Sequence, residues 1–229
     1  MNQDEIRDMF SHVDHTCLKV DATWEDIRRL CDEGMQYHAA TVCLPPAYVR
    51  QARKYVGDRL GISTVIGFPN GYSTTAVKIA EAIGAISDGA DELDMVIRVG
   101  WVKEGNYEAV EEEIRAIKGV CGKKVLKVII ETCLLTYEEK VEMCRVVAAA
   151  GADYIKTSTG FSNGGASPAD VALLAQNCPE GVKVKASGGI ATVADVWHFL
   201  VVGADRIGTS RLVAAIEETE NAKKEREGK

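Results

Sequence analysis

Short runs rich in valine, isoleucine and leucine alternate along the chain with longer segments in which apolar residues recur every three or four positions. The short runs are typical of buried strands, and the longer segments are typical of helices that pack against a sheet. Because the two kinds of segment alternate throughout, we expect the strands to run parallel. The eight predicted strands cover residues 13–16, 40–44, 64–68, 93–97, 125–130, 154–157, 182–186 and 206–208.

The predicted helices begin at recognisable capping signals. Thr23, Thr136 and Thr192 are each followed three residues later by an acidic residue, which is the pattern of a capping box or a near relative of one. Ser167 precedes Pro168, and proline is favoured at the first position of a helix. These signals indicate where helices start without any knowledge of the tertiary structure.

The tripeptide Gly-Ala-Asp occurs three times, each time between a predicted helix and the next strand. Eight such βα units in 229 residues fit a single-domain (β/α)8 TIM barrel, an α/β fold whose active site lies at the carboxyl ends of its strands. A doubly wound open sheet is the alternative, although the Gly-rich dinucleotide fingerprint is absent after the first strand. The domain is expected to span residues 1–229, with a charged tail from about residue 217 that is frayed or disordered.

Composition narrows the classes of function. The chain has 27 lysines and arginines against 34 aspartates and glutamates, a net charge of −7, and no basic run, so nucleic acid is not an expected partner. No apolar stretch is long enough to span a bilayer, and the N-terminus lacks the pattern of a signal peptide, so we expect a cytoplasmic protein without membrane contacts. The seven cysteines have no CxxC spacing, which indicates reduced thiols and no metal site.

Four charged residues interrupt predicted strands that are otherwise apolar: Asp94, Lys127, Lys156 and Lys185, on strands four to seven in order. Unpaired buried charges are unfavourable, so a pair such as Asp94 with Lys127 is expected. A lysine that is buried beside a second cation loses its proton readily, and a neutral amine forms Schiff bases with carbonyl compounds. Lys156, with Lys185 on the neighbouring strand, is therefore the candidate nucleophile. The alternative is a lysine whose stem packs and whose amine reaches solvent.

Glycine-rich turns follow the last three predicted strands. Gly160 follows strand six, Gly188 and Gly189 follow strand seven, and Ser210 comes just after strand eight. Exposed backbone N–H groups in such turns bind phosphate, and barrels often bind phosphate after strands seven and eight. The alternative is that these glycines only allow the chain to turn.

Six motifs resemble the deoxyribose-phosphate aldolase family, in the same order along the chain. They are Asp14-His15-Thr16, Gly67-Phe68-Pro69, Glu92-Leu93-Asp94, and the runs 126–132, 154–161 and 184–189. The resemblance covers residues 14–212, and the run Lys-Thr-Ser-Thr-Gly that begins at Lys156 is highly specific.

This resemblance implies a lyase, a class I aldolase that acts in deoxyribose phosphate catabolism. Such an enzyme reversibly cleaves 2-deoxy-D-ribose 5-phosphate to D-glyceraldehyde 3-phosphate and acetaldehyde through a lysine Schiff base, with no metal or other cofactor. Its partners are small phosphorylated sugars and aldehydes. A homodimer or homotetramer is expected, because symmetric homo-oligomers are common among enzymes of this kind.

The family's pattern also implies roles for individual residues. Lys156 would form the Schiff base, Lys185 would keep it deprotonated and assist proton transfer, and Asp94 would donate and accept protons. Lys127 matches the lysine paired with that acid, and Thr16 lies where the family contacts the sugar chain. The phosphate would be held by the loops at Gly160, Gly188, Gly189 and Ser210.

Two departures from the family's pattern concern the phosphate end and the tail. Phe161 stands where some members carry a basic residue, and Arg211 stands where some carry a second serine, so Arg211 is a candidate for the missing charge. The last tyrosine is Tyr154, so no tail tyrosine reaches the site. The functional alternatives are a transaldolase-like enzyme with a ketose donor and a phosphosugar-binding barrel without turnover.

Overall fold

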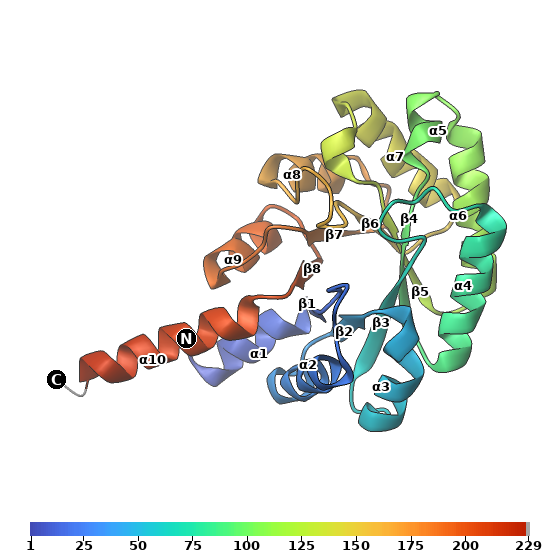
Figure 1. Cartoon of the computed structure of the whole chain (residues 1–229). Helices are drawn as coiled ribbons and strands as arrows, with labels where there is room; N and C mark the ends of the chain where they lie inside the picture. Colours follow the sequence, from blue (N-terminus) through green and yellow to red (C-terminus); the bar gives the residue numbers. More distant parts are fainter. Residues whose placement is uncertain (228–229) are drawn as a thin grey trace.

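The computed structural model describes the backbone of residues 1–227 and the side chains of residues 1–219. Its centre is a closed barrel of eight parallel strands that follow one another in chain order (Figure 1). The strands are β1 (Val13–Thr16), β2 (Thr41–Leu44), β3 (Gly61–Ile66), β4 (Glu92–Val96), β5 (Val125–Ile129), β6 (Tyr154–Lys156), β7 (Lys183–Ser187) and β8 (Arg206–Thr209). The predicted (β/α)8 barrel is therefore confirmed, and the open sheet is wrong.

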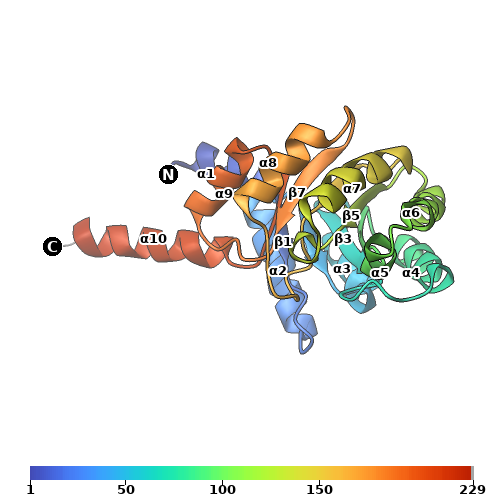
Figure 2. The same cartoon turned by 90° about the horizontal axis from the view of Figure 1, so that it is seen from above.

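Helices lie between successive strands and surround the barrel (Figures 1 and 2). The α-helices are α1 (Gln3–Ser11), α2 (Trp24–Tyr37), α3 (Val49–Val56), α4 (Thr75–Asp88), α5 (Val99–Lys103), α6 (Tyr107–Cys121), α7 (Tyr137–Ala149), α8 (Pro168–Asn177), α9 (Val193–Val201) and α10 (Leu212–Glu227). Two short 3-10 helices, η1 (Pro46–Tyr48) and η2 (Thr132–Leu134), precede α3 and α7.

The capping signals place the helix starts correctly. The Thr23, Thr136 and Thr192 side chains each accept a hydrogen bond from the backbone N–H three residues on, and the acidic residue there completes the capping box. Ser167 caps α8 in the same way, with Pro168 at the first helical position. A side-chain cap of this kind is worth about 1 kcal/mol of stability.

Strand β3 is the element whose predicted limits differ most from the structure. It begins at Gly61, because residues 61–64 pair with all of β2. It ends at Ile66, because Gly67 has a φ of +62°, which breaks the extended backbone before Phe68. Apolar character predicts a strand through Phe68, but Phe68 lies in the turn that follows the strand.

The barrel closes where β1 pairs with β8, and the two faces of its wall differ in character. Val13 lies beside Ile207 and Asp14 beside Gly208. Along each strand alternate side chains point to opposite faces. Val13, Leu93 and Leu126 belong to the apolar core, whereas their neighbours Asp14, Asp94 and Lys127 make buried ion pairs with one another. The strands thus carry an apolar outer face and a charged inner face.

Helix α10 points away from the barrel in both views (Figures 1 and 2). Its backbone is helical to Glu227, which includes most of the segment expected to be a frayed tail from residue 217. That expectation stays a prediction, and residues 228–229 lie outside the described part of the chain. None of the helices in the described part is both long and apolar enough to cross a membrane.

Candidate active site

A buried network of ion pairs fills the middle of the barrel. Its carboxylates belong to Asp14, Glu92 and Asp94, and its cations belong to Lys127, Lys156, Lys185 and Arg206. The strands that supply these residues are β1, β4, β5, β6, β7 and β8. The four residues that sequence reasoning selected therefore meet in one place, together with three that it did not select.

Asp94 lies at the centre of the network and is fully buried. Its Oδ1 accepts from Lys127 Nζ at 2.9 Å, while its Oδ2 accepts from Lys156 Nζ at 2.7 Å and from Lys185 Nζ at 2.6 Å. Burial by itself would raise the pKa of this carboxyl, but the three ammonium groups outweigh burial and hold the pKa well below its ordinary value. The predicted pair between Asp94 and Lys127 is confirmed, and Asp94 also forms ion pairs with Lys156 and Lys185.

The three lysines differ in the direction of their pKa shifts. Burial lowers the pKa of Lys156, and the Lys185 ammonium lowers it further, against the opposing effect of Asp94. Burial also acts to lower the pKa of Lys185, but Asp14 and Asp94 outweigh it and raise that pKa. The pKa of Lys127 shifts in the same direction as that of Lys185. Burial acts to lower it, but the carboxylate partners outweigh burial and raise it well above the ordinary value. Lys156 is thus the one lysine of the three that loses its proton more easily than a solvated lysine.

Three further residues of the network, Asp14, Glu92 and Arg206, were not selected from the sequence as site residues. Arg206 donates to Asp14 Oδ1 at 2.5 Å and to Glu92 Oε2 at 3.0 Å, and Lys127 Nζ lies 2.5 Å from Glu92 Oε2. Asp14 also forms an ion pair with Lys185. A signal for Glu92 did exist, because Glu92 and Asp94 share one strand parity. Arg206 opens β8, where a charged residue is ordinarily a solvated one.

The charge balance of this network favours the loss of one proton. Three carboxylates face four cations, so full protonation leaves one uncompensated positive charge in a buried volume. Loss of one proton makes the network neutral, which burial favours. The lowered pKa of Lys156 makes that amine the group that gives up the proton.

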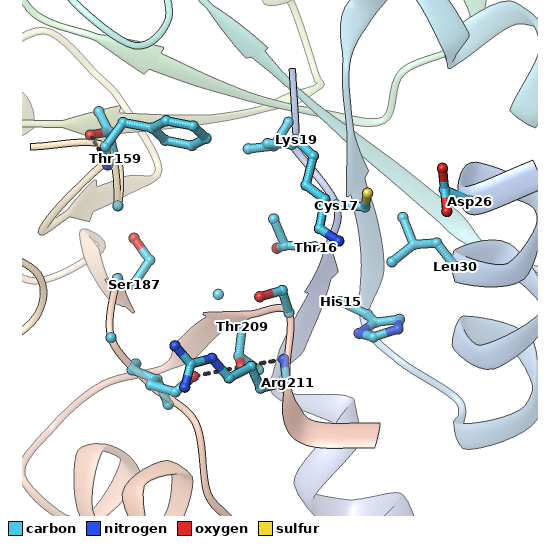
Figure 3. Close-up of a pocket in the computed structure, with 18 of the residues that line it drawn as sticks. His15, Thr16, Cys17, Lys19, Asp26, Leu30, Thr159, Ser187, Thr209 and Arg211 are labelled. Carbon is cyan, nitrogen blue, oxygen red and sulfur yellow. Dashed lines mark hydrogen bonds between the residues drawn. The ribbon is translucent and has the colours of Figure 1, made fainter. Parts of the chain in front are cut away.

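A cavity of about 450 Å³ opens above the network. Lys156 lines this cavity with 3% of its surface exposed, whereas Asp94, Lys127 and Lys185 lie beneath and do not line it. Of the other predicted site residues, the cavity wall includes Thr16, Gly160, Gly188, Gly189 and Ser210. Figure 3 shows Thr16 on one side of the cavity and Thr159 and Ser187 on the other. A ligand in this cavity reaches the Lys156 amine and none of the other lysines of the network.

The glycine loops that line the cavity contain backbone N–H groups that make no hydrogen bond within the described part of the protein. Among the described residues, the N–H groups of Gly160, Gly189 and Ser210 have no protein acceptor within hydrogen-bonding distance. Gly188 packs tightly on the preceding loop, because a Cβ at Gly188 would lie 3.0 Å from Gly165 Cα. Free N–H groups held in a rigid turn form an anion site without any basic side chain.

Three exposed cationic side chains of the described residues line the cavity: Arg29, which pairs with Asp26, and Lys19 and Arg211. Arg211 and Lys19 are both exposed, and neither forms an ion pair with another described residue. Figure 3 shows Lys19 extending toward Thr16, with Arg211 below Thr209. Phe161 also lines the cavity and stacks edge-on against Phe68 at 5.3 Å between ring centroids. Sequence reasoning named Arg211 but missed Lys19, which lies on an ordinary-looking loop after β1.

The fold and the motifs recur in known proteins. The model of the DeoC/LacD family aldolases matches residues 8–212. A deoxyribose-phosphate aldolase of Streptococcus agalactiae is 52% identical over 212 residues, which are 93% of this chain and 95% of the relative. One of Clostridium botulinum is 52% identical over 222 residues, which are 96% of this chain and 99% of the relative.

Solved structures agree with these relatives. A putative deoxyribose-phosphate aldolase from Coccidioides immitis superposes with a TM-score of 0.90 at 41% identity, over 94% of this chain and 87% of the other. A tetrameric deoxyribose phosphate aldolase from Aeropyrum pernix gives a TM-score of 0.85 at 34% identity, over 94% and 92%. The buried lysine network, the barrel and these similarities together lead to one conclusion: the chain belongs to the DeoC/LacD family of aldolases.

Proposed function

We propose that the protein is a class I deoxyribose-phosphate aldolase that reversibly cleaves 2-deoxy-D-ribose 5-phosphate to D-glyceraldehyde 3-phosphate and acetaldehyde. One observation carries the proposal: Lys156 alone among the lysines of the buried network both lines the cavity and has a lowered pKa. A neutral amine at the floor of a cavity is a nucleophile for a carbonyl carbon. The name shared by relatives at 52% identity supports the choice of substrate.

The proposed reaction begins at C1 of the open-chain sugar. The Lys156 amine adds to the aldehyde, water leaves, and an iminium forms. The bond between C2 and C3 then breaks as the C3 hydroxyl gives up its proton, and the electron pair of that bond moves to the iminium nitrogen to give an enamine. D-glyceraldehyde 3-phosphate departs, C2 takes up a proton, and water releases acetaldehyde from Lys156.

The proton steps fall to Asp94 and Lys185. Asp94, acting through a water molecule, accepts the C3 hydroxyl proton, and the pair of Asp94 and Lys185 returns a proton to C2 through the same water. Their contact of 2.6 Å supports such a transfer. Lys127 holds the other oxygen of Asp94 and so fixes the orientation of the carboxylate. This assignment provides a group for enamine protonation without a tail tyrosine.

The phosphate end of the substrate has a separate site in this proposal. The free N–H groups at Gly160, Gly189 and Ser210 would bind its oxygens, and the turn at Gly188 lets the two loops approach each other. Arg211 would add the positive charge that Phe161 does not supply. Thr16, on the opposite wall, would contact the sugar chain. Binding at this remote end orients the reacting carbons over Lys156.

Borohydride reduction in the presence of acetaldehyde, followed by peptide mass mapping, tests the proposal. We expect an ethyl group on Lys156, no such group in Lys156→Ala, and unchanged trapping in Lys183→Ala, which removes an exposed lysine from β7. Absence of the ethyl group from folded protein would exclude acetaldehyde as the donor. A ketose donor trapped on Lys156 would indicate a transaldolase-like enzyme, and no adduct with either would indicate a binding role.

We also propose that the protein works as a homodimer or homotetramer. The support is the tetrameric relative from Aeropyrum pernix and the prevalence of symmetric assemblies among enzymes. The cytoplasmic location stays a prediction.

A further inference from the structure

Glu131 has an unusual backbone for its residue type. It is the second residue after β5 and has φ +53° and ψ +66°, the left-handed region that an L-residue other than glycine rarely adopts. The segment on either side is held to the catalytic strand, because Ile130 N–H donates to Lys156 O at 3.0 Å and Thr132 N–H donates to Thr157 O at 2.8 Å. Strained residues of this kind persist where the surroundings impose them, most often at functional sites.

The Glu131 side chain is buried without a cation. Only 4% of the residue is exposed, and no lysine, arginine or histidine among the described residues forms an ion pair with it. Its carboxylate accepts from Thr159 Oγ1 at 2.5 Å and from the Thr159 backbone N–H at 3.2 Å. Hydrogen bonds to an ionised acceptor are the strong kind, and here they are what compensates for the burial of the charge.

The contact continues into the loop that lines the cavity. Thr159 Oγ1, which donates to Glu131, also accepts from the Phe161 N–H at 3.1 Å. The turn from Thr159 to Phe161 is thereby fixed at both ends, with Gly160 at φ +84° between them. Fixing the two ends of this turn sets the direction of the free Gly160 N–H.

Packing holds this turn in place only in part, mainly through the contact of Phe161 with Phe68. A second cavity of about 140 Å³, lined by Glu131, Thr159 and Phe161 among others, lies next to the first, and Thr159 and Phe161 line both. Figure 3 shows Thr159 at the wall of the larger cavity. Because cavities border the turn on two sides, its position depends on its hydrogen bonds as well as on that aromatic contact.

We propose that Glu131 is a positioning residue for the phosphate end of the substrate: by holding Thr159 it fixes the turn that presents the Gly160 N–H to the cavity. The inference rests on the proposed function, since the ligand it concerns is the phosphate of 2-deoxyribose 5-phosphate. Glu131 itself touches neither the substrate nor Lys156. It acts through Thr159 alone.

The test compares Glu131→Gln with Glu138→Gln, an exposed glutamate in the first turn of α7. Glutamine keeps the shape but removes the charge and one acceptor oxygen. We expect KM for 2-deoxyribose 5-phosphate to rise about tenfold in Glu131→Gln, as loss of one charge-assisted bond predicts, with kcat nearly unchanged. The ratio of kcat/KM for this substrate to that for unphosphorylated 2-deoxyribose falls by the same factor, and Glu138→Gln changes neither quantity. Equal losses on both substrates, or no loss on either, would overturn the proposal.

A second pair of variants breaks the same contact from the other side, in case Glu131→Gln does not fold. Thr159→Val removes the hydroxyl at constant shape, and Thr159→Ser retains it. We expect the selective rise in KM in the valine variant and its absence in the serine variant. In the double variant the effects of Glu131→Gln and Thr159→Val should not add, because both remove one interaction; additive effects would overturn the proposal. Acetaldehyde trapping on Lys156 involves no phosphate. If the wild-type protein showed no trapping, the aldolase function would be contradicted, and not the role of Glu131.

Discussion

The same residue type performs different tasks within a few ångströms in this protein. Lys127, Lys156 and Lys185 all lie in the barrel, yet only Lys156 has a lowered pKa, because it shares Asp94 with Lys185 whereas the other two have additional carboxylate partners. Lys183, on the same strand as Lys185, is exposed. The number of carboxylates around an amine, and not its burial alone, sets the direction of its pKa shift.

This difference predicts the behaviour of Lys185→Met. The Lys185 ammonium lowers the pKa of Lys156, so its removal raises that pKa. Lys156 attacks only as the neutral amine, so the acid limb of Schiff-base formation moves to higher pH in the variant. Borohydride trapping of acetaldehyde as a function of pH measures this shift directly, with Lys183→Met as the matched control. Turnover should also fall roughly 10²–10⁴-fold, as loss of a general acid does. A variant whose trapping profile coincides with that of the wild type would contradict this account.

Strands set which charges meet. Asp14 on β1 reaches Lys185 on β7, Arg206 on β8 and the Thr41 hydroxyl on β2, so one side chain connects the first strands of the barrel to the last. Burial would raise the pKa of Asp14, but its cationic neighbours outweigh burial and lower it. Closure of the barrel is thus stabilised by the same carboxylate that holds Lys185 in its charged form.

This arrangement predicts a pH-dependent loss of stability in Asp14→Asn. The substitution leaves buried cations uncompensated, so the free energy of unfolding near neutral pH should fall by about 3–5 kcal/mol. A depressed pKa gives stability that is complete above the ordinary aspartate pKa of 3.8 and is lost as the pH falls toward the folded-state pKa.

The wild type therefore loses this stabilisation in acid, and the gap between it and Asp14→Asn narrows below about pH 3.8. Urea unfolding at a series of pH values measures the gap. Asp58→Asn, at an exposed residue that forms no ion pair with the described residues, is the control. A gap that is constant down to the pH of acid unfolding would show that the Asp14 carboxylate is not the source.

On the scale of the whole molecule, the proposed function requires an acidic chain to bind an anion through a local arrangement. The net charge of −7 does not attract a sugar phosphate, so phosphate binding as proposed would depend on backbone N–H groups and on Arg211 and Lys19, which line the cavity. Helix α10, which follows β8, projects away from the barrel (Figure 1).

The assembly prediction also belongs to this scale. Light scattering on purified protein should give a molar mass of two or four times the chain mass of 24.8 kDa. Dilution over the concentration range used for activity assays checks that the assembly persists there. A mass of one chain under these conditions would show that the proposed oligomer is wrong.

Local signals in the sequence determined much of this protein. Capping boxes fixed the helix starts, since a cap depends on residues three positions apart. Apolar runs located all eight strands, and the polar interruptions at Asp94, Lys127, Lys156 and Lys185 marked the residues that meet in the barrel. These patterns can be read from sequence because side-chain alternation in a buried strand leaves few positions for a charge.

Tertiary structure decided the rest. Asp14, Glu92 and Arg206 join the network only because β1, β4 and β8 come together across the closed barrel. The order of the lysine pKa values depends on how many carboxylates each amine faces, and the contact between Glu131 and Thr159 joins residues 28 positions apart. Such effects depend on distances of a few ångströms between distant segments, and electrostatic and hydrogen-bonding energies change too steeply with distance for sequence spacing to predict them.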